Sequence, residues 1–166
     1  MAITRAKKET LLAGIDEALK SAVSVAFVHF KGLTVGEVDE VRAKLREEGV
    51  KYRVVKKTLL KRVLGSLGIS GDMPELSGEV AIVYLPKTVG EDITAPARLL
   101  NDFVKKFKEK LQFLGGVSES RFLSKEETVT IAGIPGVQAL RGMFVNIINS
   151  PIQRFAIALG EVAKTK

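Results

Sequence analysis

The residues with the clearest chemical potential are six cations in one short stretch. Between positions 51 and 62, the sequence KYRVVKKTLLKR holds six Lys or Arg and no Asp or Glu. Its pattern predicts a strand over 51–55 and a helix starting near Thr58, which places Lys56 and Lys57 at the junction. The free N–H groups and positive dipole end of a helix, flanked by lysines, are typical of a phosphate site. The stretch predicts contact with RNA or DNA, and a solvated basic helix is the alternative.

Charge elsewhere in the chain points the same way. Residues 1–66 hold 14 Lys or Arg against 8 Asp or Glu, a net +6, whereas residues 67–166 hold 12 against 11, a net +1. A one-sided positive field attracts polyanions, and nucleic acid is the commonest one in a cell. We expect the N-terminal cations and the loop lysine after the first strand to converge with the basic stretch. The predicted RNA-contacting cations are Arg5, Lys7, Lys8, Lys31, Arg53, Lys56, Lys57 and Lys61.

Residues for catalysis or metal binding are scarce. The chain has no Cys and one histidine, His29, so thiolate chemistry and a tetrahedral zinc site are not expected. The absence of Cys fits a reducing cytoplasm. The glycines of 65–71 match no phosphate-loop pattern, and the pair Glu47-Glu48 fits a solvated helix face. We predict no enzyme, no catalytic residue, no metal and no cofactor.

Hydrophobic spacing predicts alternating helices and strands over the first 116 residues. Helices are predicted over 5–22, from an N-cap at Thr34 to near Gly49, from Thr58 to Gly65, and around Pro96. Strands are predicted over 23–30, 51–55, 79–85 and 111–114, the last ended by Gly115 and Gly116. One sheet of about four strands with helices packed on it follows, with its pairs parallel or split. The predicted class is α+β, a ferredoxin-like two-layer α/β sandwich followed by a helical C-terminal extension.

The C-terminal part has a different character. Residues 124–127 have the form of a capping box, with Ser124 as the N-cap. Residues 133–136 (GIPG) then interrupt the helical pattern. From Val137 onward two apolar helical stripes follow, which Pro151 is expected to separate. Residues 139–160 contain two arginines and no Asp or Glu. We expect domains at 1–133 and 134–166, with the last helix covered by its own domain, by a partner protein or, least favoured, by a lipid surface.

Three separated segments resemble one known family. These are 30–35 (FKGLTV), 45–50 (LREEGV) and 53–59 (RVVKKTL). The similarity continues through 76–78, 111–117 and 131–135, so it covers nearly the whole chain. In this joint spacing the chain resembles the bacterial stalk-base protein of the large ribosomal subunit, large-subunit protein ten.

The resemblance implies a ribosomal scaffold in the cytoplasm. It implies that a ferredoxin-like domain binds 23S rRNA beside large-subunit protein eleven, and that the last helix carries dimers of the acidic stalk protein, which recruit translational GTPases. On this pattern Lys31, Arg53, Lys56, Lys57 and Thr58 face RNA. The implied partner-binding residues are Ile152, Phe155, Ala156, Leu159 and Val162.

Two positions depart from the family pattern. Lys57 stands where Asn is usual, which replaces an amide by a charge. Glu79 follows Gly78, at a position where Pro is common in the family. The 15 residues after Pro151 imply room for one or two stalk dimers. The rival interpretation is a free-standing RNA-binding regulator whose C-terminal helix packs on its own domain.

Overall fold

The computed structural model describes residues 5–87, 92–107 and 110–164, with the side chains of residues 5 and 6 left out. The chain divides into two compact units, Met1–Ile134 and Pro135–Lys166.

The first unit is built on one antiparallel sheet with the strand order β2-β3-β1-β4-β5. Its first four strands have the ferredoxin-like order, so the predicted fold class is confirmed. The predicted number of strands was one too low, because the short β5 has too few residues to show a period. The strands are β1 (Ala22–Phe30), β2 (Lys51–Val55), β3 (Val80–Pro86), β4 (Leu111–Ser118) and β5 (Arg121–Leu123).

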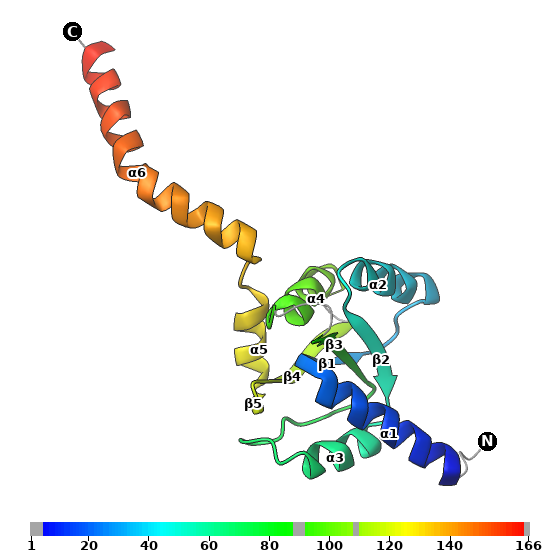
Figure 1. The fold of residues 1–166 in the computed structure, drawn as a ribbon. Helices are drawn as coiled ribbons and strands as arrows, with labels where there is room; N and C mark the ends of the chain where they lie inside the picture. The colour runs from blue at the N-terminus through cyan, green and yellow to red at the C-terminus, as the bar shows by residue number, and fades with distance from the viewer. Residues whose placement is uncertain (1–4, 88–91, 108–109, 165–166) are drawn as a thin grey trace. The chain divides into compact units, whose positions relative to one another are not determined.

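Helices cover both faces of the sheet, which makes three layers where two were expected (Figure 1). On one face α2 and α4 bury Leu45 and Leu100 against the sheet residue Val28. On the other, α1 and α3 bury Ile15 and Leu60 against Phe27. Buried β1 side chains alternate between these two cores, as the strand period requires. The helices are α1 (Arg5–Ser21), α2 (Val35–Glu47), α3 (Lys57–Ser66), α4 (Ala95–Lys106) and α5 (Lys125–Ala132).

Both predicted capping boxes are present. Thr34 Oγ1 accepts from the Glu37 N–H at 3.4 Å, and Glu37 Oε2 accepts from the Thr34 N–H at 2.7 Å. Ser124 and Glu127 form the same reciprocal pair at the start of α5. Two orphan donors are satisfied at each helix start, which fixes where α2 and α5 begin.

Strand β4 continues through the glycines that were predicted to end it. A Cβ atom at Gly116 would lie 2.8 Å from the Val25 carbonyl oxygen, and one at Gly115 would lie 2.7 Å from the Leu123 carbonyl oxygen. These glycines therefore permit close approach of neighbouring strands, the other common meaning of Gly in a strand. The register of β1 against β4 shifts at the same place, between Phe27 and Val28.

The second unit is the single helix α6 (Val137–Lys164), which continues through Pro151. The expected interruption at this proline is therefore wrong. Proline removes one backbone N–H and crowds the carbonyl four residues earlier, and a helix can accommodate both by bending. Figure 1 shows a bend within α6. No single helix in the described part of the chain is long and apolar enough to cross a membrane, although α5 and α6 taken together pass that test by length and composition.

Candidate nucleic-acid interface

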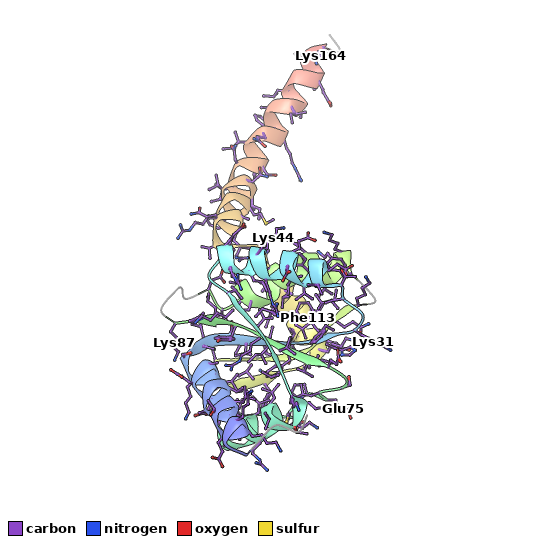
Figure 2. The ribbon with its side chains drawn as sticks, turned by 90° about the vertical axis from the view of Figure 1, so that its right-hand side faces the viewer. Lys31, Lys44, Glu75, Lys87, Phe113 and Lys164 are labelled. Carbon is purple, nitrogen blue, oxygen red and sulfur yellow. The ribbon has the colours of Figure 1, made fainter. Side chains whose placement is uncertain are left out.

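The topology brings two of the predicted basic segments to one end of the sheet. Strand β3 lies between β2 and β1 and runs antiparallel to both, so its start is flanked by their ends. Lys31 follows β1, and Lys56 follows β2. With about 4.8 Å between neighbouring strands, these backbone positions are about 10 Å apart. Figure 2 shows Lys31 on the opposite side of the first unit from Lys87, which follows the other end of β3.

Four of the predicted cations form no ion pair among the described residues. Among the described residues, no ion pair holds the side chains of Lys31, Lys56, Lys57 or Lys61, all of which are exposed. Neighbouring cations on the α2 side are neutralised. Lys106 Nζ lies 2.6 Å from Glu40 Oε1, and Lys110 Nζ lies 2.8 Å from Glu37 Oε1. The β2–α3 junction therefore carries a group of exposed lysines whose charge no ion pair among the described residues neutralises.

The start of α3 adds backbone donors to these cations. Its N-cap is Lys56, which makes no side-chain cap, and its first turn contains no acidic residue. The Lys56 carbonyl accepts from the N–H groups of Leu59 and Leu60, at 3.0 Å each. Thr58 stands exposed in the first turn, and Lys61 lies one turn beyond Lys57. An uncapped helix start with flanking lysines has the chemistry of a phosphate contact.

Arg53 occupies a different place from the other predicted contacts. It is half-buried on β2, and its Nη1 donates to the Gly14 carbonyl of α1 at 3.0 Å. A Cβ atom at Gly14 would lie 3.2 Å from the same nitrogen, so the guanidinium rests directly on the helix backbone. This side chain fastens α1 to the sheet, a role that the sequence did not reveal because the contact spans 39 residues.

The N-terminal cations lie on α1. Lys7 and Lys8 are exposed in its first turns, and no hydrogen bond or ion pair among the described residues links them to the β2–α3 junction. The N-terminal end of α1 extends past β2 (Figure 1). The side chain of Arg5 lies outside the described residues. The structure thus gathers Lys31, Lys56, Lys57 and Thr58 but does not show that α1 joins them.

Two hollows at this end of the sheet were not foreseen from the sequence. One, of about 560 Å³, lies among the ends of β1 and β2 and the start of β3 and includes Phe30, Val54 and Glu79. The other, of about 700 Å³, is more polar and includes Glu75, with His29 at its edge. His29 Nδ1 lies 2.9 Å from the Glu79 backbone oxygen, so this nitrogen carries the proton. Both hollows depend on strand register, which no local pattern reveals.

No catalytic or metal arrangement accompanies these features in the described residues. No group of three or more His, Asp or Glu side chains there is placed to hold a metal ion. One carboxylate has a strongly shifted pKa: hydrogen bonds from Lys110 and from the Thr34 N–H lower the pKa of Glu37 to about 2. Both donors stabilise the charged form, the Lys110 ammonium most and the Thr34 N–H of the helix cap next.

The helix α6 presents the second predicted site. None of its residues is buried, and Ile152, Phe155 and Leu159 expose 69%, 67% and 55% of their surface. With Ala156 and Val162 they follow helical spacing and share one side of the helix. Ile157 and Val145 are also exposed, which the predicted stripes had not included. The apolar surface of α6 is therefore broader than one stripe.

A basic α+β domain joined to an unpacked apolar helix belongs to the class of small proteins that work inside a larger assembly. The ribosomal protein L10 family matches residues 3–105, and the chain belongs to this family. It is 36% identical to the large ribosomal subunit protein uL10 of Lactobacillus acidophilus, over 97% of this chain and 93% of that protein. It is 38% identical to the uL10 protein of Staphylococcus epidermidis, over 99% and 96%.

The family assigns this chain to the large subunit of the cytoplasmic ribosome. The uL10 protein of Staphylococcus aureus is also 36% identical, over 99% of this chain and 96% of that protein. The resemblance seen in the sequence is therefore confirmed. Its relatives are structural proteins rather than enzymes.

Proposed function

We propose that this protein forms the base of the large-subunit stalk. In this proposal the first unit binds large-subunit (23S) rRNA beside large-subunit protein eleven. The helix α6 anchors one or two dimers of the acidic stalk protein, which support recruitment of translational GTPases. The chain itself catalyses no reaction. Lys7 and Lys8 of α1 form a second contact area. The main RNA-contacting residues are Lys31, Lys56, Lys57, Thr58 and Lys61.

The observation that carries the proposal is that one chain combines unpaired cations on a folded domain with a 28-residue helix that buries nothing. An isolated helix is only marginally stable in water, and most helices in proteins are stabilised by packing of their apolar face. Burial of the four largest predicted contacts, Ile152, Phe155, Leu159 and Val162, would contribute about 6–12 kcal/mol gross. A partner protein that covers these residues supplies that burial.

The proposed binding of rRNA by the first unit is tested with a double charge reversal, Lys56→Glu with Lys57→Glu. We expect binding to the large-subunit rRNA to be lost while the circular dichroism spectrum is unchanged. Wild-type affinity should fall with salt at a log–log slope of about 0.7–0.9 per phosphate neutralised. The matched control is Lys87→Glu with Arg46→Glu, two exposed cations at the opposite end of the sheet, which should cost far less. Equal losses for the two double variants would contradict the assigned surface.

The proposed anchoring of stalk-protein dimers by α6 is tested by truncation after Asn149. The shortened chain should lose the acidic stalk protein in a pull-down and keep its rRNA affinity. Native mass measurement of the intact complex should show one or two dimers. Capture of dimers by the truncated chain would show that residues beyond Asn149 are not the anchor. Failure of the intact protein to co-sediment with large subunits after a high-salt wash would favour the free-standing regulator.

A further inference from the structure

An apolar groove lies beside the unpaired lysines at the β2–α3 junction. It has a volume of about 560 Å³, within the usual range of about 300–1,000 Å³ for small-ligand pockets. Its walls come from the end of β1 (Phe30), the end of β2 (Val54), the β2–α3 junction and the start of β3. Val54 exposes 49% of its surface although it lies on a strand. The groove is therefore an open apolar surface in a strongly basic neighbourhood.

Strand register sets the order of the groove residues. Val28, Ala81 and Val54 are cross-strand partners on the face that α2 and α4 cover. Two residues further along, on the same face, Phe30 lies beside Glu79, and the Phe30 N–H donates to the Glu79 carbonyl at 3.3 Å. Lys56 follows Val55, which ends β2 opposite Val80. Glu79 therefore lines the groove together with Phe30 and Lys56, beyond Val54 toward the end of β2.

The Glu79 carboxylate has no partner in the part of the chain that the structure describes. Glu79 is exposed, and among the described residues it accepts hydrogen bonds through its backbone oxygen only. A carboxylate repels phosphate, so a ligand here must turn its anionic part toward Lys56 and Lys57 and a donor edge toward Glu79. A flat apolar body between these two parts fits against Phe30 and Val54.

We propose that this groove holds one unpaired base of the bound RNA, with guanine preferred. Unstacked bases are recognised by apolar and aromatic side chains together with hydrogen bonds to their Watson–Crick edge. Guanine presents two adjacent donors, N1–H and the N2 amino group, which match the two oxygens of a carboxylate. Adenine and cytosine offer one amino donor, and uracil offers a single N–H between two acceptors. The proposal rests on the proposed rRNA binding and adds a base-reading site to it.

The substitution Glu79→Gln separates base reading from simple electrostatics. Removal of a negative charge from a lysine-rich surface should tighten RNA binding if charge alone acts. Base reading predicts the opposite sign, a roughly tenfold loss of affinity for large-subunit rRNA, the scale of one bidentate base contact. The charge-matched control is Glu75→Gln, an exposed carboxylate in the other hollow, which should bind as the wild type or slightly tighter. Tighter binding by the Glu79→Gln variant would overturn the proposal.

Chemical probing with kethoxal, which modifies N1 and N2 of unpaired guanines, locates the base. The full-length chain is bound at saturation to large-subunit rRNA. At least one guanine that reacts in free rRNA should be protected by the wild type and exposed again by Glu79→Gln and by Val54→Ser. The control Val35→Ser removes an equally β-branched apolar side chain, 80% exposed and outside the groove, and should keep the protection.

The outcomes distinguish this inference from the function on which it rests. Identical protection in the wild type and both groove variants, with rRNA bound in each case, would reject the base site and leave rRNA binding intact. No binding of rRNA by the wild type would reject the proposed function, and the base site with it.

Discussion

The helices α4 and α6 are both rich in apolar residues, but the chain uses them in opposite ways. α4 buries Leu100 and Phe103 in the core that it shares with α2, and its Asn101 Nδ2 donates to the Ala132 carbonyl at 3.0 Å. α6 is more than twice as long, 28 residues against 12, and buries none of them. Apolar composition alone therefore does not show whether a helix belongs to the core of its own chain.

The difference lies in what surrounds each helix. α4 connects β3 to β4 and packs on one face of the sheet, so its apolar side meets a surface formed by the same chain. α6 follows the break at residues 133–136, after both faces of the sheet have been covered by the other helices. The two cores of the first unit contain no residue of α6, and we propose that another protein covers the apolar surface of α6.

The largest contrast is expected from truncating one leucine in each helix. Leu100→Ala removes a fully buried side chain and should lower the free energy of unfolding by about 2–5 kcal/mol. Leu159→Ala removes a side chain that is 55% exposed and should change it by less than about 0.5 kcal/mol. Urea denaturation of the isolated protein measures both. A comparable loss from Leu159→Ala would show that α6 packs on its own chain, and the comparison would fail.

A pair of glycine substitutions should give opposite effects. Gly116→Ala places a Cβ atom 2.8 Å from the Val25 backbone oxygen, so β1 or β4 must shift, at a cost of about 1–3 kcal/mol. At Gly142 in α6 no atom lies within 4 Å of an added Cβ. Gly142→Ala should favour the helix by about 0.5–1 kcal/mol. Urea denaturation should detect the first, and far-UV circular dichroism a gain of helix from the second. Destabilisation by Gly142→Ala would reveal a neighbour that packs against α6.

These glycines also show where sequence reasoning succeeds and where it stops. Local signals predicted the capping boxes at Thr34 and Ser124, because a cap depends on residues three apart. Gly115 and Gly116 were misread as a strand end, since only the paired strand explains why a side chain is excluded. The prediction that Pro151 interrupts the helix was wrong for a related reason. Proline within a helical pattern is compatible with either a helix end or a bend, and the local sequence does not distinguish the two.

The candidate site divides in the same way. The cluster at the β2–α3 junction was predictable because its lysines are adjacent in the sequence. The contact of Arg53 with Gly14, and the groove formed by Phe30, Val54 and Glu79, join residues from separate strands and helices. Such contacts follow from strand order and register, which are set by the packing of the whole unit.

A smaller effect is expected from Arg53 and its counterpart on α6. Arg53→Met removes the hydrogen bond to the Gly14 carbonyl and should cost about 0.5–1.5 kcal/mol of unfolding free energy. Arg154→Met on exposed α6 should change it by less than about 0.5 kcal/mol. Urea denaturation and rRNA affinity are measured on the same samples. If Arg53→Met keeps full stability but binds rRNA more weakly, the guanidinium acts in the interface and not as a fastener of α1.

The smallest expected effect concerns acid stability, which the first unit should control. The pKa of Glu37 is lowered to about 2 from an ordinary 4.5, chiefly by the hydrogen bond from Lys110 and then by the Thr34 N–H. A carboxylate with a lowered folded-state pKa stabilises the fold above pH 4.5, and this contribution is lost as the pH falls from 4.5 toward 2. Glu37→Gln should therefore flatten the pH dependence of the unfolding free energy in this window.

The control for acid stability is the chain truncated after Asn149, which retains Glu37 and Lys110 and lacks the last turns of α6. Its acid profile should match that of the intact protein, because the residues removed include one carboxylate, Glu161. Lys110→Met, which removes the principal donor to Glu37, should flatten the profile in the same direction as Glu37→Gln. A profile that changes on truncation but not in these two variants would mean that α6 contributes to the stability of the folded unit and would contradict this prediction.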